Sequence, residues 1–146
     1  MKNFLMTALL AFTVAASAFA ASPEKVNATI LSNFHSAFKG ASNISWVTTG
    51  DYTKATFDLA KTKMEVYYNP EGDIIGTSKT IDLNELPLRV KRSFAKQFDG
   101  YNVNEAIYFD GFGEKAYYVA GENEKEAVIL KVGENNKTSM FERTKK

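Results

Sequence analysis

The 146-residue sequence contains no cysteine. This absence excludes disulfides, thiolate metal sites and a cysteine nucleophile, and it also excludes a lipid anchor on an N-terminal cysteine. The fold must therefore be stabilised by its core alone. The 16 aromatic residues that follow residue 20 are the main material for that core, because each large aromatic side chain buries much area.

The sequence also lacks an excess of either charge. It has 18 Lys and Arg against 17 Asp and Glu. Removal of the first 20 residues takes away one lysine, Lys2, and no acid, which leaves 17 of each. A protein that binds nucleic acid needs surplus basic side chains, so the composition predicts no nucleic-acid partner.

Histidine is almost absent, and His35 is the single one. A zinc site needs three or four ligands, and a general base needs an orienting acid and a reacting partner. We therefore expect His35 to be a surface or boundary residue of a helix.

Two short motifs have the letters of known sites without their context. Asp110-Gly111-Phe112-Gly113 matches the kinase metal motif, but the glycine-rich loop and lysine strand of a kinase are missing, so we expect a hairpin turn. The segment 69–73 is acidic but lacks the alternating oxygen ligands of a calcium loop. The sequence therefore predicts a non-enzymatic protein with no cofactor and no metal.

An apolar run occurs near the N-terminus. Lys2 precedes the apolar stretch 4–16, and Ala18-Phe19-Ala20 places small residues two apart, as signal peptidase requires. The run is short for a membrane span, which needs roughly 20 apolar residues. We expect residues 1–20 to be a signal peptide, cleaved after Ala20 or alternatively after Ala18, and residues 21–146 to be one periplasmic or secreted domain.

The remaining chain contains an internal repeat, which is decisive for architecture. An apolar stripe of helical spacing, closed by a glycine, recurs sixty residues later: Val26, Ile30, Phe34, Phe38 and Gly40 match Leu86, Val90, Phe94, Phe98 and Gly100. After the stripe, Phe57 and Leu59 match Tyr117 and Val119, and with a two-residue slip Val66 and Tyr68 match Val128 and Leu130. Ser22-Pro23-Glu24 predicts the start of the first helix, and Pro87 that of the second.

Alternating segments bounded by turn residues follow each helix. We predict strands near residues 44–47, 52–59, 64–68 and 74–80 in a first unit (about 22–80). In a second unit (about 82–143) we predict strands near 103–110, 115–120, 127–132 and 138–143. Short turns between neighbours indicate an antiparallel meander. The fold class is therefore α+β, with two tandem helix-plus-meander units that share one antiparallel sheet and have both helices on one face.

This pattern resembles the β-lactamase-inhibitor-like, PepSY-like family. The residues that carry the resemblance are Phe38, Ile44-Ser45-Trp46, Tyr52-Thr53-Lys54-Ala55-Thr56-Phe57, Tyr67, Gly72, Ile81, Leu86-Pro87 and Val90. The resemblance implies tandem units, a curved sheet and a location outside the inner membrane, with no known reaction. In the inhibitor relatives the concave sheet face and its loops grip an enzyme, but those contacts are not part of the shared pattern. The second unit departs at Ala106, where the first has Trp46, and at Lys115, where it has Ala55.

Side chains that alternate away from the helices form the candidate binding surface. Trp46, Phe57 and Tyr68 share the parity of the buried face. The residues predicted on the opposite, exposed face are Tyr52, Lys54, Glu65, Tyr67, Tyr118, Ile129 and Lys131. Tyrosine gives contact area and keeps a polar tip, so this face is interpreted as the binding surface for a protein or peptide of the cell envelope. Inhibition of an envelope enzyme or peptidase is one outcome of such binding.

Two other interpretations of this face remain open. The residues also fit an ordinary solvated face that cross-strand pairs stabilise. A small-ligand carrier is the third hypothesis, and it predicts a concave pocket lined by Tyr52, Tyr67 and Tyr118.

Overall fold

The computed structural model describes residues 19–21 and 25–146, and over these residues the chain forms two helices and nine strands. The helices are α1 (Ala28–Ala37) and α2 (Leu88–Gln97). The strands are β1 (Phe19–Ala21), β2 (Ser42–Thr48), β3 (Thr53–Leu59), β4 (Thr62–Tyr68), β5 (Ile74–Ile81), β6 (Asn102–Gly111), β7 (Glu114–Glu122), β8 (Glu126–Gly133) and β9 (Thr138–Lys145). The predicted α+β class and the order of two helix-plus-meander units are confirmed. Residues 1–18 of the predicted signal peptide and the predicted helix start at Ser22 lie outside the described residues. Phe19 and Ala20 form β1 together with Ala21, so the predicted cleavage after Ala20 would remove two of the three residues of this strand.

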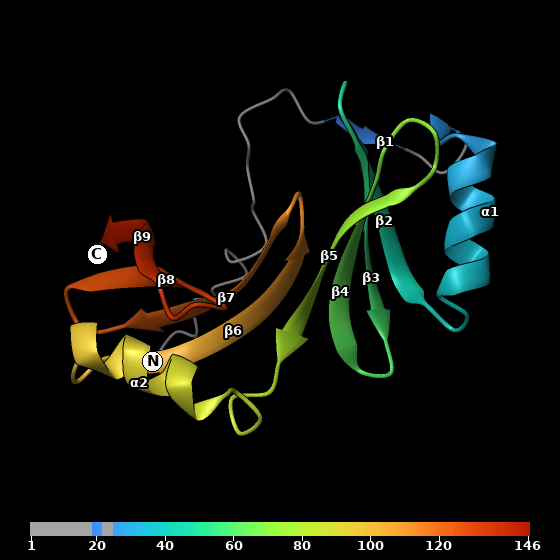
Figure 1. Ribbon diagram of the computed structural model, residues 1–146. Helices are drawn as coiled ribbons and strands as arrows, with labels where there is room; N and C mark the ends of the chain where they lie inside the picture. Colours follow the sequence, from blue (N-terminus) through green and yellow to red (C-terminus); the bar gives the residue numbers. More distant parts are fainter. Residues whose placement is uncertain (1–18, 22–24) are drawn as a thin grey trace.

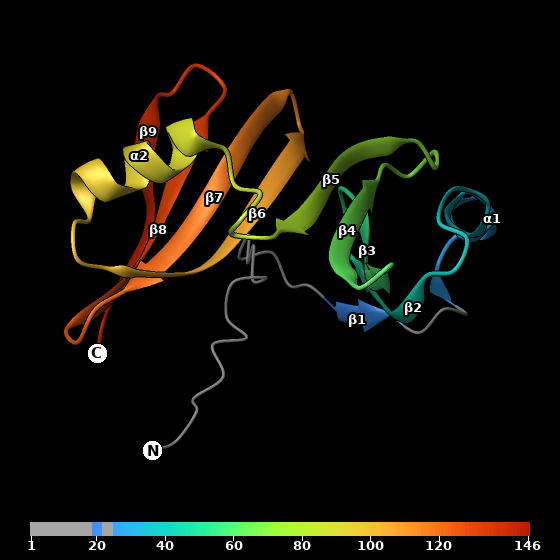
Figure 2. The same ribbon diagram turned by 90° about the horizontal axis from the view of Figure 1, so that it is seen from below.

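All the described strands belong to one antiparallel sheet whose spatial order follows the chain from β1 to β9. Figures 1 and 2 show that this sheet bends between β5 and β6, with α1 and α2 on its outer, convex side. The pairing register shifts within four strand pairs, between β2 and β3, β4 and β5, β6 and β7, and β8 and β9. Such bulges increase local twist and bending, so they favour the curved sheet that the resemblance implies.

In the first unit, α1 packs its apolar stripe against an aromatic core. The Phe34 ring is fully buried and lies 5.1 Å from Trp46 and 4.9 Å from Phe57, measured between centroids. The helix begins at Ala28, later than predicted, because Asn27 supplies the N-cap and its Oδ1 accepts a 2.8 Å hydrogen bond from the Thr29 N–H. An Asn side chain satisfies an N–H that the first helical turn leaves unpaired.

In the second unit, α2 begins at Leu88 directly after Pro87, as predicted. It buries Val90 and Phe94 against Val119 and Leu130 of the sheet. The helices of the two units match at a distance of sixty residues, and each is followed by a glycine with positive φ, Gly40 at +86° and Gly100 at +78°.

Strand pairing corrects the predicted alignment of the later strands. Trp46 pairs with Ala55, whereas its match Ala106 pairs with Val119. Val119 therefore occupies the place of Ala55, not that of Leu59. The same pairing continues on the next strand, where Leu130 replaces Val66 rather than Tyr68. The β6–β7 hairpin is longer than the β2–β3 hairpin. After this insertion, matching residues of the two units are sixty-four residues apart in the sequence instead of sixty.

Tyr68 provides a test of the first-unit core. Its side chain is fully buried, and its hydroxyl has no hydrogen-bond partner among the described residues. Burial raises the pKa of Tyr68 from 10.0 to about 12. Because an unpaired buried hydroxyl is costly, we expect Tyr68→Phe to increase the free energy of unfolding by about 1 kcal/mol in urea denaturation at neutral pH.

The same variant makes a prediction at high pH. A tyrosine with a raised pKa in the folded state contributes stability below pH 10 that is lost as the pH rises through about 12. Tyr68→Phe should therefore lose less stability than the unmodified chain across this interval. A Tyr68→Phe variant that is less stable at neutral pH would instead show that the hydroxyl has a favourable partner.

Candidate binding face

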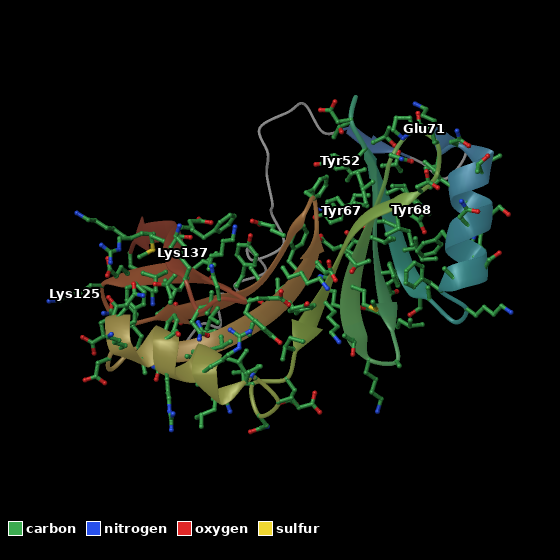
Figure 3. The ribbon with its side chains drawn as sticks, viewed as in Figure 1. Tyr52, Tyr67, Tyr68, Glu71, Lys125 and Lys137 are labelled. Carbon is green, nitrogen blue, oxygen red and sulfur yellow. The ribbon has the colours of Figure 1, made fainter. Side chains whose placement is uncertain are left out.

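The sheet face opposite the helices carries the residues that alternation predicted. Tyr67 and Tyr118 form one cluster with Phe109, and Tyr52 and Ile129 pack against it. Lys54 pairs with Glu65, and the Lys131 ammonium lies over the Tyr118 ring. In Figure 3, Tyr52 and Tyr67 lie on the side of the first meander that faces the second, whereas Tyr68 points toward α1. Their placement on one face is therefore confirmed, while their role in binding stays a prediction.

The prediction that this face is exposed is wrong for three of its residues. Glu65, Tyr67 and Tyr118 are only 1%, 4% and 3% exposed. Alternation along a strand gives the face on which a side chain lies, but it does not give the bend that brings the two halves of the sheet together. These three side chains form the floor of a concave surface.

A close approach of two glycines helps to form this concave surface. Gly76 of β5 pairs with Gly111 of β6, and a Cβ on Gly111 would lie 2.4 Å from the Gly76 Cα. A side chain does not fit there, so the glycines allow the tip of the β6–β7 hairpin to lie against β5. The Phe112 N–H at this tip donates a 3.0 Å hydrogen bond to the Ile75 carbonyl oxygen.

Six aromatic side chains form a continuous row across the concave face, which we call the aromatic row. In spatial order they are Tyr52, Tyr67, Phe112, Phe109, Tyr118 and Phe141. Successive ring centroids are 5.4, 5.6, 6.1, 6.4 and 5.0 Å apart. These separations are within the range of favourable aromatic pairs. Phe112 and Phe141 are 58% and 42% exposed, so the row presents two rings to solvent above a packed floor.

Phe112 occupies an unusual position for a large side chain. It has φ +52° in the two-residue turn between β6 and β7, followed by Gly113 at +82°. The predicted hairpin is thus confirmed, but turns with two positive φ values favour Asn, Asp and Gly. A phenylalanine in this backbone region is conformationally costly. Its presence points to a use for the ring beyond closing the turn.

Beneath the row, Glu65 is the centre of a buried hydrogen-bond network. Its Oε1 accepts from Lys54 Nζ at 3.0 Å and from Thr56 Oγ1 at 3.4 Å. Its Oε2 accepts from the Tyr67 hydroxyl at 2.9 Å and from Ser78 Oγ at 3.2 Å. Each oxygen has two donors, so the carboxylate connects the three neighbouring strands β3, β4 and β5.

The second unit has a similar but more open arrangement. Glu114 accepts from Lys131 Nζ at 2.6 Å and from the Tyr118 hydroxyl at 3.3 Å. Its side chain is 45% exposed, against 1% for Glu65. A glutamate, a lysine and a tyrosine thus interact in both units. The glutamate is buried in the first unit and partly exposed in the second.

The electrostatic environment keeps the floor tyrosines neutral. Burial, together with the charge of Glu65, raises the pKa of Tyr67 far above its usual range. Burial and the charge of Glu114 raise the pKa of Tyr118 in the same way. Both hydroxyls therefore remain hydrogen-bond donors at physiological pH.

Sequence reasoning missed part of this face. Phe109 had a usable signal, because it alternates with the helix-facing Ala106 and so has the parity of the concave face. Phe112 and Glu114 lie in and beside a turn, where alternation gives no direction. Phe141 lies in the last predicted strand, whose exposed side chains show no apolar pattern. His35 lies on the exposed side of α1, away from this face.

Comparisons with known proteins identify the fold. A scan against protein-family models and a search of curated proteins both find no match. Among solved structures, the chain is similar to a BLIP-like protein from Bacteroides fragilis NCTC 9343, with a TM-score of 0.62, 19% identity, and coverage of 82% of this chain and 85% of that one. It is also similar to a DUF2874 family protein from Bacteroides uniformis ATCC 8492, with a TM-score of 0.67, 13% identity, and coverage of 82% and 89%.

A third solved structure is also similar. It is a protein from Bacteroides eggerthii DSM 20697 that is provisionally described as periplasmic, with a TM-score of 0.69, 13% identity, and coverage of 82% and 88%. The fold implied by the sequence resemblance is therefore confirmed as BLIP-like. In the part of the chain that the structure describes, no helix has the length and apolarity needed to cross a bilayer.

The two carboxylates give a matched experiment on the face. Glu65→Gln leaves Lys54, whose side chain is 12% exposed, without an ionic partner, so we expect a loss of roughly 3 kcal/mol in the free energy of unfolding. Glu114→Gln, with the same change at an exposed pair, should cost less than about 1 kcal/mol. Chemical denaturation of both variants measures the difference, and equal losses would contradict the anchoring role of Glu65.

Tyrosine ionisation gives a second experiment. Because burial raises the pKa values of Tyr67 and Tyr118 above 10.0, they should ionise only after ordinary tyrosines in an absorbance titration. Their contribution to stability is present below pH 10 and is lost as the pH rises further. We therefore expect the late tyrosinate signal to coincide with loss of near-ultraviolet circular dichroism. Ionisation of all seven tyrosines in one early step would contradict the packed floor.

Proposed function

We propose that this chain is an exported, non-enzymatic binding protein that holds a protein or peptide against its concave face. The predicted signal peptide supports export, as does similarity to a structure provisionally described as periplasmic. The BLIP-like fold supports use of the curved face. In this proposal the concave faces of the two units act as one binding surface, with the bend of the sheet between them.

The observation that carries this proposal is the aromatic row with its two exposed rings. Phe112 and Phe141 are solvent-exposed at separate points of the row, beside the buried rings of Tyr67, Phe109 and Tyr118. Exposed aromatic rings on a packed, ordered base resemble the energetic centres of protein interfaces. The positive φ of Phe112 adds to this, because strained positions of this kind concentrate at functional sites.

The predicted residues then divide into two roles. Tyr52, Lys54, Ile129 and Lys131 remain partly exposed and contribute contacts beside the two rings. Glu65, Tyr67 and Tyr118 support the surface from below. Since the mature chain is close to neutral, affinity would come from apolar contact more than from long-range attraction. The more specific form of this proposal is that the bound partner is an envelope enzyme or peptidase, which this chain inhibits.

The packing favours a binding surface over the carrier hypothesis at this place. A carrier pocket lined by Tyr52, Tyr67 and Tyr118 needs open space between those rings. Tyr67 and Tyr118 instead pack against Phe109 at 6.2 and 6.4 Å.

Phe112→Ala and Phe141→Ala test the proposal. Both remove an exposed ring and leave the floor intact, so stability should change little. The proteins are immobilised and used to capture partners from envelope extract of the source organism. For a partner captured by the unmodified chain, we expect each substitution to weaken the measured Kd at least tenfold, which corresponds to about 1.4 kcal/mol.

Leu88→Ala is the matched control. Leu88 is 60% exposed and lies on α2, on the opposite side of the sheet. It should leave the Kd unchanged. Equal binding by all the variants would remove the concave face as the site, and equal weakening would show that the effect is not specific to it.

A further inference from the structure

The two units have the same framework but differ in the residues that fill their cores. Strand pairing places Ala106 where the first unit has Trp46, and Val119 where it has Ala55. Two residues further along these strands, Gly121 occupies the place of Phe57. The second unit therefore replaces two large rings by a methyl group and a hydrogen atom.

The packing around Phe94 compensates only in part for the loss of these two rings. In the first unit, Trp46 and Phe57 both lie about 5 Å from Phe34, the ring that matches Phe94. In the second unit the Phe94 ring covers Gly121 so closely that a Cβ there would be 2.5 Å from its Cζ. The outer side of the ring also differs, because His35 packs against Phe34 at 5.6 Å whereas Ala95 has no ring to place there.

A cavity of about 340 Å³ lies beside these positions in the second unit. Phe94 and Val119 line it, whereas Ala106 and Gly121 are not among its lining residues. Its floor is formed by the buried side chains of Leu86, Phe94, Phe98 and Val119, and its mouth includes Ala95 and Lys91 on the exposed side of α2. An apolar floor with a polar group at the opening is typical of a small-molecule site, and the volume is at the lower end of the usual range.

We infer that this cavity binds a small, flat, largely apolar molecule with an aromatic ring system about the size of an indole. The first unit supports this ligand class, because there the indole of Trp46 packs against Phe34, the match of the lining residue Phe94. Phe94 and Phe98 offer ring edges and faces for such a ligand. The exposed residues Lys91 and Asp99 both line the cavity and give its mouth one basic and one acidic group. The cavity lies between α2 and the sheet, on the opposite side from the aromatic row. It is thus independent of the proposed function.

Indole is the first probe, and the purified chain is titrated with it by calorimetry and by ligand-observed NMR. Ala95→Trp adds a large ring at the mouth without changing a buried residue. His35→Trp is the matched control, because it makes the same addition at the equivalent exposed position of α1. We expect saturable binding to the unmodified chain, at least tenfold weaker binding to Ala95→Trp, and unchanged binding to His35→Trp.

Ala106→Trp tests the internal comparison directly. If the cavity corresponds to the place of Trp46, this variant should have a higher Tm and should no longer bind indole. Should Ala106→Trp fail to fold, the Ala95→Trp and His35→Trp pair decides the question. Absence of saturable indole binding, or binding that survives Ala95→Trp, would overturn the inference.

Discussion

One constraint governs this molecule: a single sheet has both of its helices on the same face. The opposite face must then cover its own side chains or leave them in water. The bend between β5 and β6 covers them, because it brings the β6–β7 hairpin over the first meander and lets Gly76 and Gly111 meet. The floor of the concave surface is consequently a second core, formed without a helix.

The two units solve the same packing problem in different ways. The first fills the space under α1 with Trp46 and Phe57 and buries its carboxylate, Glu65, completely. The second has small residues under α2 and leaves Glu114 partly in solvent. A buried ion pair is weak evidence for stability but can fix a unique arrangement of strands.

Local sequence patterns predicted the elements of this fold well. Helical spacing around Phe34 and Phe94 and strand alternation around Tyr67 gave the helices, the strands and the face of each side chain. The predicted exposure of Glu65, Tyr67 and Tyr118 was wrong, because burial on this face depends on the curvature of the sheet. That curvature is set by contacts between distant strands. The predicted match of Val119 with Leu59 was also wrong. The longer β6–β7 hairpin shifts the pairing between the strands but leaves the alternation of side chains along each strand unchanged. Phe112 had no periodic signal, because a turn residue has no strand parity.

The order of the sheet has a consequence for how the chain assembles. Each strand from β2 to β9 pairs with the described strand that precedes it in the chain. No pairing therefore joins strands that are far apart in the strand order. Mostly local pairing lowers the entropic cost of loop closure and favours rapid folding. A chain that emerges N-terminus first can therefore grow by adding each new hairpin to the edge already formed. The first unit can complete its aromatic core before the residues of the second have appeared.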